Sequence, residues 1–339
     1  MQSVTQKILS WANVRFARFL KLAPGVTVAL AVILPGAIQA QTYPTQSIKM
    51  VVPFGPGSAT DTLARLIGDH MASTLGVSVV VENKSGALGT IGANQVAKAT
   101  PDGYTLLVGT NTTNAAIKAF VKSVPYDPQK DFAPISFLGE LTQILVVGKD
   151  SEFKDVKELL AYARSNPGKL TYAWSNTVGR MATAMLAQQA ELDLMDVPYK
   201  EAGSALMDVM AGRIDFAIDN AISTSSHIKS NSLRPLAVSS QNRLPYLPDV
   251  PTIAESAQLP DYEVKAFFAL FAPAGTPEDI VQLLSKAVQE AGKDEAIRNR
   301  LTAMGMEVLT GTPEALGNRI DTEIVKWTES ARSAGIKPL

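Results

Sequence analysis

The sequence predicts an α/β protein of two lobes, because strand-like and helix-like segments alternate in two successive sets. Short apolar runs typical of buried strands are separated by longer segments whose apolar residues recur at helical spacing. Each set covers about 100 residues, and a helical C-terminal part follows. Parallel strands need crossover connections, which are right-handed, so this order predicts parallel sheets. The length of 339 residues and the 46% of hydrophobic residues suffice for two such lobes.

The first set of elements lies between residues 48 and 109. Strands are predicted at Ile48–Phe54, Val77–Val81 and Tyr104–Gly109. Helices are predicted at Ala59–Leu75 and near Ala93–Ala97. The valine-rich second strand is typical of a strand buried on both faces. Glycine, proline and serine residues separate the elements, as turns require.

The second set runs from residue 144 to residue 238 and repeats the same alternation. Its strands are predicted at Ile144–Val147, Leu170–Ala173, Leu194–Val197, Ile214–Ile218 and Leu236–Val238. Its helices are predicted at Val156–Ala163, Arg180–Ala190, Ala202–Ala211 and Ile222–Lys229. We therefore expect a second α/β lobe built like the first.

The C-terminal part is predicted to be helical over Pro277–Ala291, Glu295–Met304 and Pro313–Ala334. Two of these helices begin with proline, which the first helical turn tolerates. The extended stretches Ile135–Val147 and Val264–Phe271 are the predicted chain crossings between the lobes. Two crossings permit closure while resisting free rotation, which suits a ligand clamp.

The first forty residues have the pattern of a secretory signal peptide. Four cationic residues precede the apolar run Leu22–Ile38, and Ala40 supplies a small residue for cleavage. The alternative is a membrane anchor, which the prolines and glycines within the short run disfavour. Cleavage near Ala40 would remove four positive charges and leave a net charge of −5. We therefore expect a soluble, exported protein.

Composition and missing motifs argue against most catalytic and cofactor-dependent functions. The chain has no cysteine and two histidines, so thiolate chemistry and three-histidine zinc sites are excluded. The nucleophile elbow, the zinc-protease motif and the Walker A motif are absent. Gly86-x-x-Gly89-x-x-Gly92 lacks the start of a dinucleotide fingerprint and predicts a tight loop. We expect no enzyme activity, no cofactor and no metal, and the nearly neutral chain gives no general attraction to nucleic acid.

A candidate ligand loop follows the first predicted strand. Phe54, Gly57, Ser58, Thr60 and Asp61 lie where this strand ends and the first helix begins. This is the ligand edge of an open parallel sheet, and the N–H groups of the helix start favour a carboxylate or phosphate. The alternative is an ordinary turn with a helix cap at Thr60 or Asp61.

The corresponding loop of the second lobe carries Ser175, Asn176, Thr177 and Arg180. Its hydroxyl and amide groups can donate hydrogen bonds, and Arg180 can form a bidentate pair with a carboxylate. The alternative is that Ser175 or Asn176 caps the helix and Arg180 is a solvated surface residue.

Three further candidates follow other predicted strands. Tyr199 offers a ring face or a hydroxyl, Asp219 selects a donor group on the ligand or fixes a water, and Asn111 adds an amide donor. The respective alternatives are a half-buried tyrosine, a helix cap and a turn residue.

Across essentially the whole exported chain, these residues stand among a series of ordered motifs. The motifs are Tyr43-Pro44, Val51-Val52-Pro53-Phe54, Ala59-Thr60-Asp61, Val79-Val80-Val81-Glu82-Asn83, Pro101-Asp102-Gly103-Tyr104-Thr105-Leu106, Pro125-Tyr126-Asp127, Asp131-Phe132-Ala133-Pro134, Val197-Pro198-Tyr199-Lys200, Leu236-Ala237-Val238, Pro248-Asp249-Val250-Pro251-Thr252, Ala272-Pro273-Ala274-Gly275-Thr276-Pro277 and Lys326-Trp327. With them the chain resembles the Bug family, the periplasmic receptors related to tripartite tricarboxylate transporters.

The resemblance implies a two-lobed Venus-flytrap fold of the type II periplasmic binding proteins, with a small organic acid held in the cleft. Residues 43–142 and 265–339 would form the first lobe, and residues 143–264 the second. Family members are similar in holding a carboxylate with loop N–H groups, hydroxyls and ordered waters. This chain departs from the family pattern at Ser58, which replaces a glycine, and at Arg180, which stands near a family histidine.

The sequence thus predicts a monomeric solute-binding receptor that passes a small carboxylate to the membrane permease of such a transporter. One alternative is a receptor that presents its ligand to a membrane sensor kinase. Another is a secreted enzyme that uses the same cleft. The ligand is expected to be aliphatic, aromatic or an amide, and the receptor to serve transport or sensing.

Overall fold

One mixed β-sheet organises the part of the chain that the computed structural model describes, residues 43–336 and 338. The predicted signal peptide, residues 1–40, lies outside the described residues. The strands are β1 (Ile48–Val52), β2 (Val79–Asn83), β3 (Thr105–Thr110), β4 (Phe132–Gly148), β5 (Thr171–Trp174), β6 (Met195–Pro198), β7 (Phe216–Asn220), β8 (Leu233–Val238), β9 (Lys265–Pro273) and β10 (Met306–Glu307). Their order is β2-β1-β3-β9-β4-β7-β5-β6, and β8 and β10 also pair with β4.

Helices connect most of these strands. They are α1 (Ala59–Leu75), the 3₁₀ turn η1 (Ala87–Gly89), α2 (Thr90–Ala97), the π-helical turn η2 (Thr112–Ala116), α3 (Ile117–Phe120), α4 (Val156–Ser165), α5 (Thr177–Gln189), α6 (Ala202–Met210), α7 (Ala221–Lys229), α8 (Ile253–Ala257), α9 (Glu278–Lys293), α10 (Glu295–Ala303) and α11 (Pro313–Ser333). None of the described helices combines the length and the apolar character needed to cross a membrane.

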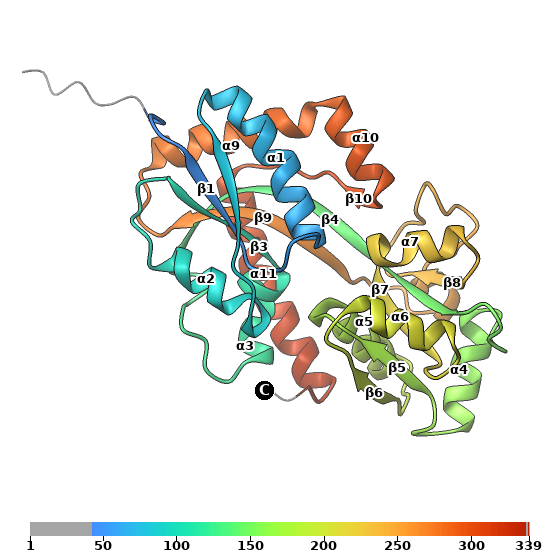
Figure 1. Cartoon of the computed structure of the whole chain (residues 1–339). Helices are drawn as coiled ribbons and strands as arrows, with labels where there is room; N and C mark the ends of the chain where they lie inside the picture. The colour runs from blue at the N-terminus through green and yellow to red at the C-terminus, as the bar shows by residue number, and fades with distance from the viewer. Residues whose placement is uncertain (1–42, 337, 339) are drawn as a thin grey trace, which may run out of the picture. The chain divides into compact units, whose positions relative to one another are not determined.

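The long strand β4 belongs to two groups of strands (Figure 1). Its residues 132–142 pair with β9, and its residues 143–148 pair with β7 and β8. We call β1, β2, β3, β9, β10 and the start of β4 the first half of the sheet. The end of β4 with β5, β6, β7 and β8 is the second half. Both predicted crossings are thus long strands, and they run side by side as β4 and β9.

Strand direction differs between the outer and central parts of the sheet. The predicted parallel pairing holds for β1 with β2 and β3, and for β5 with β6 and β7. It is wrong in the centre, where β9 is antiparallel to β3 and β4, and β4 is antiparallel to β7 and β8. Central pairing is antiparallel because the two crossings traverse the sheet in opposite directions.

The remaining differences from the predicted elements have local causes. Helix α5 begins at Thr177 instead of Arg180, because the Asn176 side chain caps it by accepting a hydrogen bond from the Gly179 N–H at 2.8 Å. Strand β2 is not buried on both faces: it lies at the sheet edge, and Val80 is 52% exposed. The short elements η2, α3, α8 and β10 were not predicted, since their apolar residues are too few to establish a period.

Two helical glycines provide a matched test of this packing. A Cβ on Gly179, in the first turn of α5, would clash with the backbone oxygen of Ile218 in β7, whereas a Cβ on Gly203 in α6 would meet nothing within 4 Å. We expect Gly179→Ala to destabilise the protein by about 1–3 kcal/mol, since backbone cannot move aside cheaply. Gly203→Ala should stabilise it by about 0.5–1 kcal/mol. Urea unfolding measures both, and equal effects would contradict the close approach of α5 to β7.

Candidate functional site

A cavity of about 180 Å³ lies where the two halves of the sheet meet. Both halves line it, with residues from the starts of α1, α5 and α7, from the end of β3, and from β4 and β9. These residues are Phe54, Ser58, Ala59, Thr60, Thr110, Asn111, Thr112, Leu141, Gln143, Asn176, Val178, Asn220, Ala266 and Phe268. Among these described lining residues, none has a charged side chain. The cavity is small beside the ~300–1,000 Å³ of pockets for drug-sized ligands, so it suits a small metabolite.

The N-termini of three helices contribute to the cavity wall. Ser58 caps α1, Asn176 caps α5 and Asn220 caps α7, and each side chain accepts a hydrogen bond from its own first turn. The capped N–H groups belong to Asp61 at 3.2 Å, Gly179 at 2.8 Å and Ser223 at 2.9 Å.

The caps leave other first-turn N–H groups without an intrahelical partner. In any α-helix, the N–H groups of the first two residues lie before the first i→i−4 bond. Ala59 and Thr60 of α1, and Val178 of α5, are such residues and line the cavity. Together with the helix dipoles, these groups favour an anion.

A buried hydroxyl in the cavity wall has no partner. Thr110, the last residue of β3, is 5% exposed, and within the described residues its Oγ1 makes no hydrogen bond. An unpaired buried hydroxyl costs free energy, on the order of 1–3 kcal/mol. The oxygen is itself shut off from the cavity space, so the side chain must turn before this hydroxyl can donate to a ligand there.

Asp61 fixes the first loop from within. Its carboxylate accepts hydrogen bonds from the Gly57 N–H at 2.9 Å, from Asn83 Nδ2 at 2.9 Å and from two Arg65 nitrogens at 2.9 and 3.2 Å. Burial alone would raise its pKa, but these bonds and the Arg65 charge lower it below its usual value. The loop residue Gly57 has a φ of +79°, which favours glycine. Asp61 therefore shapes the loop, with its oxygens already occupied.

Asp219 fixes the second loop in the same way. Its carboxylate is 1% exposed and accepts hydrogen bonds from Ser175 Oγ at 3.2 Å and from Asn176 Nδ2 at 3.1 Å. It also accepts bonds from the backbone and the side chain of Asn220, at 2.7 and 2.8 Å. This one buried carboxylate, at the end of β7, thus accepts hydrogen bonds from the residues that cap α5 and α7. Burial outweighs these bonds and raises the pKa of Asp219 to about 6.

Asn111 joins β3 to β9. Its Nδ2 donates to the Lys265 carbonyl at 3.2 Å, and its Oδ1 accepts from the Phe267 N–H at 2.6 Å. Its side chain is 1% exposed, although the residue borders the cavity. The amide is therefore committed to the backbone of the crossing strand.

The second predicted loop contacts the first half of the sheet at Thr177. Its hydroxyl forms a hydrogen bond with the hydroxyl of Thr112, which follows β3 in the first half. This contact joins the first turn of α5 to η2 beside the cavity.

Seven predicted site residues do not line the cavity: Gly57, Asp61, Ser175, Thr177, Arg180, Tyr199 and Asp219. The side chains of Arg180 and Tyr199 are held by other contacts. Arg180 stacks over the Trp174 ring at 4.5 Å from its centroid, and its Nη2 lies 3.4 Å from an Asp196 carboxylate oxygen. The Tyr199 hydroxyl donates to Asp208 Oδ2 at 2.5 Å, and burial together with Asp208 raises its pKa to about 12. The structure does not bring either side chain to the cavity wall.

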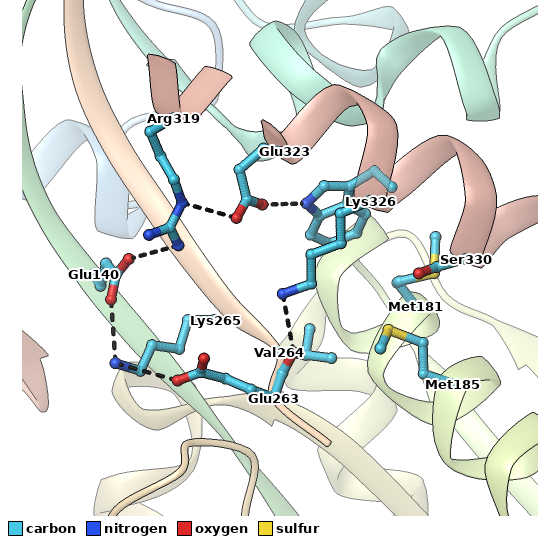
Figure 2. A pocket seen from close by; sticks show the side chains of 11 residues that line it. Glu140, Met181, Met185, Glu263, Val264, Lys265, Arg319, Glu323, Lys326 and Ser330 are labelled. Atoms are coloured by element: carbon cyan, nitrogen blue, oxygen red, sulfur yellow. Dashed lines mark hydrogen bonds and ion pairs between the residues drawn. The ribbon is translucent and has the colours of Figure 1, made fainter. Parts of the chain in front are cut away.

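A second cavity, of about 130 Å³, lies against the crossing strands and α11 and is strongly charged (Figure 2). Buried Glu140 accepts from Lys265 Nζ at 3.1 Å and from Arg319 Nη2 at 3.2 Å. Arg319 also donates to buried Glu323 at 2.9 Å, and Trp327 Nε1 donates to the same carboxylate at 2.7 Å. Burial would lower the pKa of Lys265, but nearby carboxylates, Glu140 first, raise it instead. We call Glu140, Lys265, Arg319 and Glu323 the crossing network. Its two carboxylates and two cations balance in charge, and its ion pairs join α11 to β4 and β9.

Sequence reasoning missed several residues that line the first cavity. Thr110 and Asn220 directly follow predicted strands, beside the predicted Asn111 and Asp219, so the strand-end signal could have included them. Leu141, Gln143, Ala266 and Phe268 lie within the long crossings, where nothing in the apolar pattern distinguishes a cavity residue from a core residue. Within the described residues, no group of three or more histidine and acidic side chains is placed to hold a metal ion.

The raised pKa of Asp219 predicts a specific pH dependence of stability. Between the usual value of 3.8 and about 6, the folded protein binds more protons than the unfolded chain, so this residue makes folding less favourable as pH rises. Asp219→Asn keeps the size of the side chain and does not titrate. The free energy of unfolding of Asp219→Asn, minus that of the wild type, should rise by about 2.4 kcal/mol from pH 4 to pH 7. Urea unfolding at several pH values measures this difference, and a difference independent of pH would contradict the assignment.

Comparison with known proteins is consistent with this geometry. The family model "Tripartite tricarboxylate transporter family receptor" matches residues 63–335. The chain is 33% identical over 317 residues to protein BugT of Bordetella pertussis, which covers 92% of this chain and 96% of BugT.

Two solved structures share the fold along most of the chain. R. palustris Rpa4515 with adipate superposes with a TM-score of 0.81 at 35% identity, covering 88% of this chain and all of that one. MatC of Rhodopseudomonas palustris with bound malate superposes with a TM-score of 0.76 at 35% identity, covering 85% of this chain and all of that one. The fold is therefore the two-lobed α/β fold of these periplasmic binding proteins, and the chain belongs to the tripartite tricarboxylate transporter receptor family, which includes the Bug proteins.

Proposed function

We propose that this chain is a periplasmic receptor that captures a small organic acid in the 180 Å³ cavity and delivers it to the membrane permease of a tripartite tricarboxylate-type transporter. The observation that carries the proposal is the meeting of the N-termini of α1, α5 and α7 at one cavity whose described lining residues carry no charged side chain. Uncharged donors and helix dipoles can bind a carboxylate without an arginine or lysine. The adipate and malate of the two solved relatives support an organic acid as the ligand.

The residues of the proposed site have two roles: some donate hydrogen bonds to the ligand, and others hold the loops in position. Thr60, Thr110 and the first-turn N–H groups of α1 and α5 donate to the carboxylate oxygens. Asp61 and Asp219 position the two loops from behind, and Asn111 holds the crossing strand beside them. Ser58, Ser175 and Asn176 act through the backbone and Asp219, as caps and loop braces.

We further propose that residues 43–142 with 265–339 form one lobe, that residues 143–264 form the other, and that both close on the ligand. The hydrogen bond between Thr112 and Thr177 would join the lobes in the closed state. Residues 1–40 would direct export and be removed near Ala40. The receptor acts as a monomer and changes no covalent bond of its ligand, since no charged side chain among the described lining residues could transfer a proton.

Thr110→Val tests the proposed site. Valine has the shape of threonine without the hydroxyl, so the unliganded variant loses no hydrogen bond and should unfold at an equal or higher temperature than the wild type. Its affinity for the carboxylate ligand should fall by about tenfold, roughly the loss of one charge-assisted hydrogen bond. A thermal-shift screen of small carboxylates identifies the ligand, and titration calorimetry measures the affinities.

Arg180→Ala is the matched control, because Arg180 lies over Trp174 and outside the cavity. We expect it to change the affinity less than twofold. If Arg180→Ala weakens binding tenfold and Thr110→Val has no effect, the ligand binds elsewhere. If none of the carboxylates raises the unfolding temperature or releases heat, the proposed function is wrong.

A further inference from the structure

Asp219 lies one side chain behind the wall of the 180 Å³ cavity. Asn176 and Asn220 line the cavity, and their Nδ2 atoms donate to Asp219 Oδ1 at 3.1 and 2.8 Å. Each amide nitrogen carries a second proton, which can be donated to a ligand oxygen. Such an oxygen would lie about 5 Å from Asp219 Oδ1, because one hydrogen bond of ordinary length stands on either side of the nitrogen.

No cation balances the charge of Asp219 within the part of the chain that the structure describes. Its carboxylate accepts hydrogen bonds from neutral groups only, those of Ser175, Asn176 and Asn220. Asp61 differs, since Arg65 pairs with it at 2.9 Å. The hydrogen bonds compensate the charge of Asp219 without cancelling it, and burial still raises its pKa to about 6.

The ionisable groups on the elements packed against β7 leave this charge unbalanced. Those elements are β4, β5, α5, α6 and α7. Their ionisable residues are Glu140 in β4, Tyr172 in β5, Arg180 in α5, Asp208 in α6, and His227 and Lys229 in α7. Glu140, Arg180 and Asp208 form ion pairs with other residues, and burial raises the pKa of Tyr172 to about 12, so its phenol is neutral. His227 and Lys229 lie in the last turn of α7, whereas Asp219 precedes its first turn.

The carboxylate of Asp219 can take up a proton without disturbing the helix caps. Three of its four hydrogen bonds end on Oδ1, whereas Oδ2 accepts only from Ser175 Oγ, at 3.2 Å. A proton on Oδ2 can be donated back to Ser175 Oγ, since a hydroxyl group both donates and accepts. One hydrogen bond then reverses its direction, and the bonds from Asn176 and Asn220 to Oδ1 remain.

On the basis of the proposed function, we infer that the receptor takes up a proton from solvent at Asp219 when a carboxylate enters the cavity, so that acid anion and proton are bound together. A like charge about 5 Å away disfavours the ionised form of Asp219 and raises its pKa. Linkage is reciprocal, so protonation of Asp219 tightens carboxylate binding by the same factor. The affinity is therefore highest below the unliganded pKa of about 6, and it falls as pH rises from there through the higher pKa of the complex.

Titration calorimetry of the exported protein tests this inference with malate, adipate and benzoate, which are ionised above pH 6.5. The heats of binding in buffers of different ionisation enthalpy give the number of protons taken up per ligand. For a tenfold coupling, the wild type should take up about half a proton at pH 6.5 and almost none at pH 8.5. Its affinity should fall about threefold between these two pH values.

Asp219→Asn keeps the size of the side chain and cannot take up a proton. It should bind without proton uptake, with the same affinity at pH 6.5 and pH 8.5, and up to about tenfold more tightly than the wild type at pH 8.5. The matched control replaces both histidines of the chain, His70→Gln with His227→Gln, because histidine is the side chain that ordinarily titrates in this range. This double variant should take up protons as the wild type does.

The outcomes separate this inference from the proposed function. If the wild type binds an acid without proton uptake, or if uptake persists in Asp219→Asn or disappears in the histidine variant, the inference is overturned and the proposed function stands. If none of the three acids binds, the proposed function itself fails. Should Asp219→Asn fail to fold, the proton uptake of the wild type and of the histidine variant decides.

Discussion

The shared strand β4 is the constraint on which the site depends. Its first part pairs with β9 and its last part with β7 and β8, so one continuous backbone holds both halves of the sheet in register. Its residues Leu141 and Gln143 lie at the change of partner and line the cavity. The starts of α1, α5 and α7 follow strands of the two halves, and they reach one cavity because β4 places those strand ends together.

The crossing network reinforces this constraint on the side of the strands that α11 covers. Glu140 of β4 and Lys265 of β9 pair directly, and Arg319 of α11 bonds to Glu140 and Glu323 (Figure 2). Because Glu140 pairs with both Lys265 and Arg319, removing one of these cations leaves the buried carboxylate with one partner instead of two. An intact buried network adds little net stability, so its physical role is to specify how α11 sits on the crossings.

Most elements could be predicted from the sequence because their apolar residues establish a period. The ends of α1 were predicted from the turn residues before it and from the helical spacing of its apolar residues. In the structure Ser58, and not Thr60 or Asp61, caps the helix, and Gly76 follows it in a left-handed conformation. Strand direction in the centre could not be predicted, since an apolar run such as Val264–Phe271 reads the same in both directions. The candidate loops were likewise predictable from strand ends, but the direction of Arg180 was not. Its position over Trp174 depends on Asp196 of β6, a strand that local sequence does not place beside α5.

The buried carboxylates of Asp61 and Asp219 explain how a cavity without charged lining residues can favour an anion. Each carboxylate lies behind a loop and accepts hydrogen bonds there, so its charge is compensated before any ligand arrives. The same bonds hold the loop backbone and the helix caps in fixed positions and leave first-turn N–H groups free at the cavity wall. A donor set that is held in place before binding loses little conformational entropy when the ligand enters. Such a site therefore suits an anion that is recognised by geometry, and residues of β4 and β9 supply the apolar part of its wall.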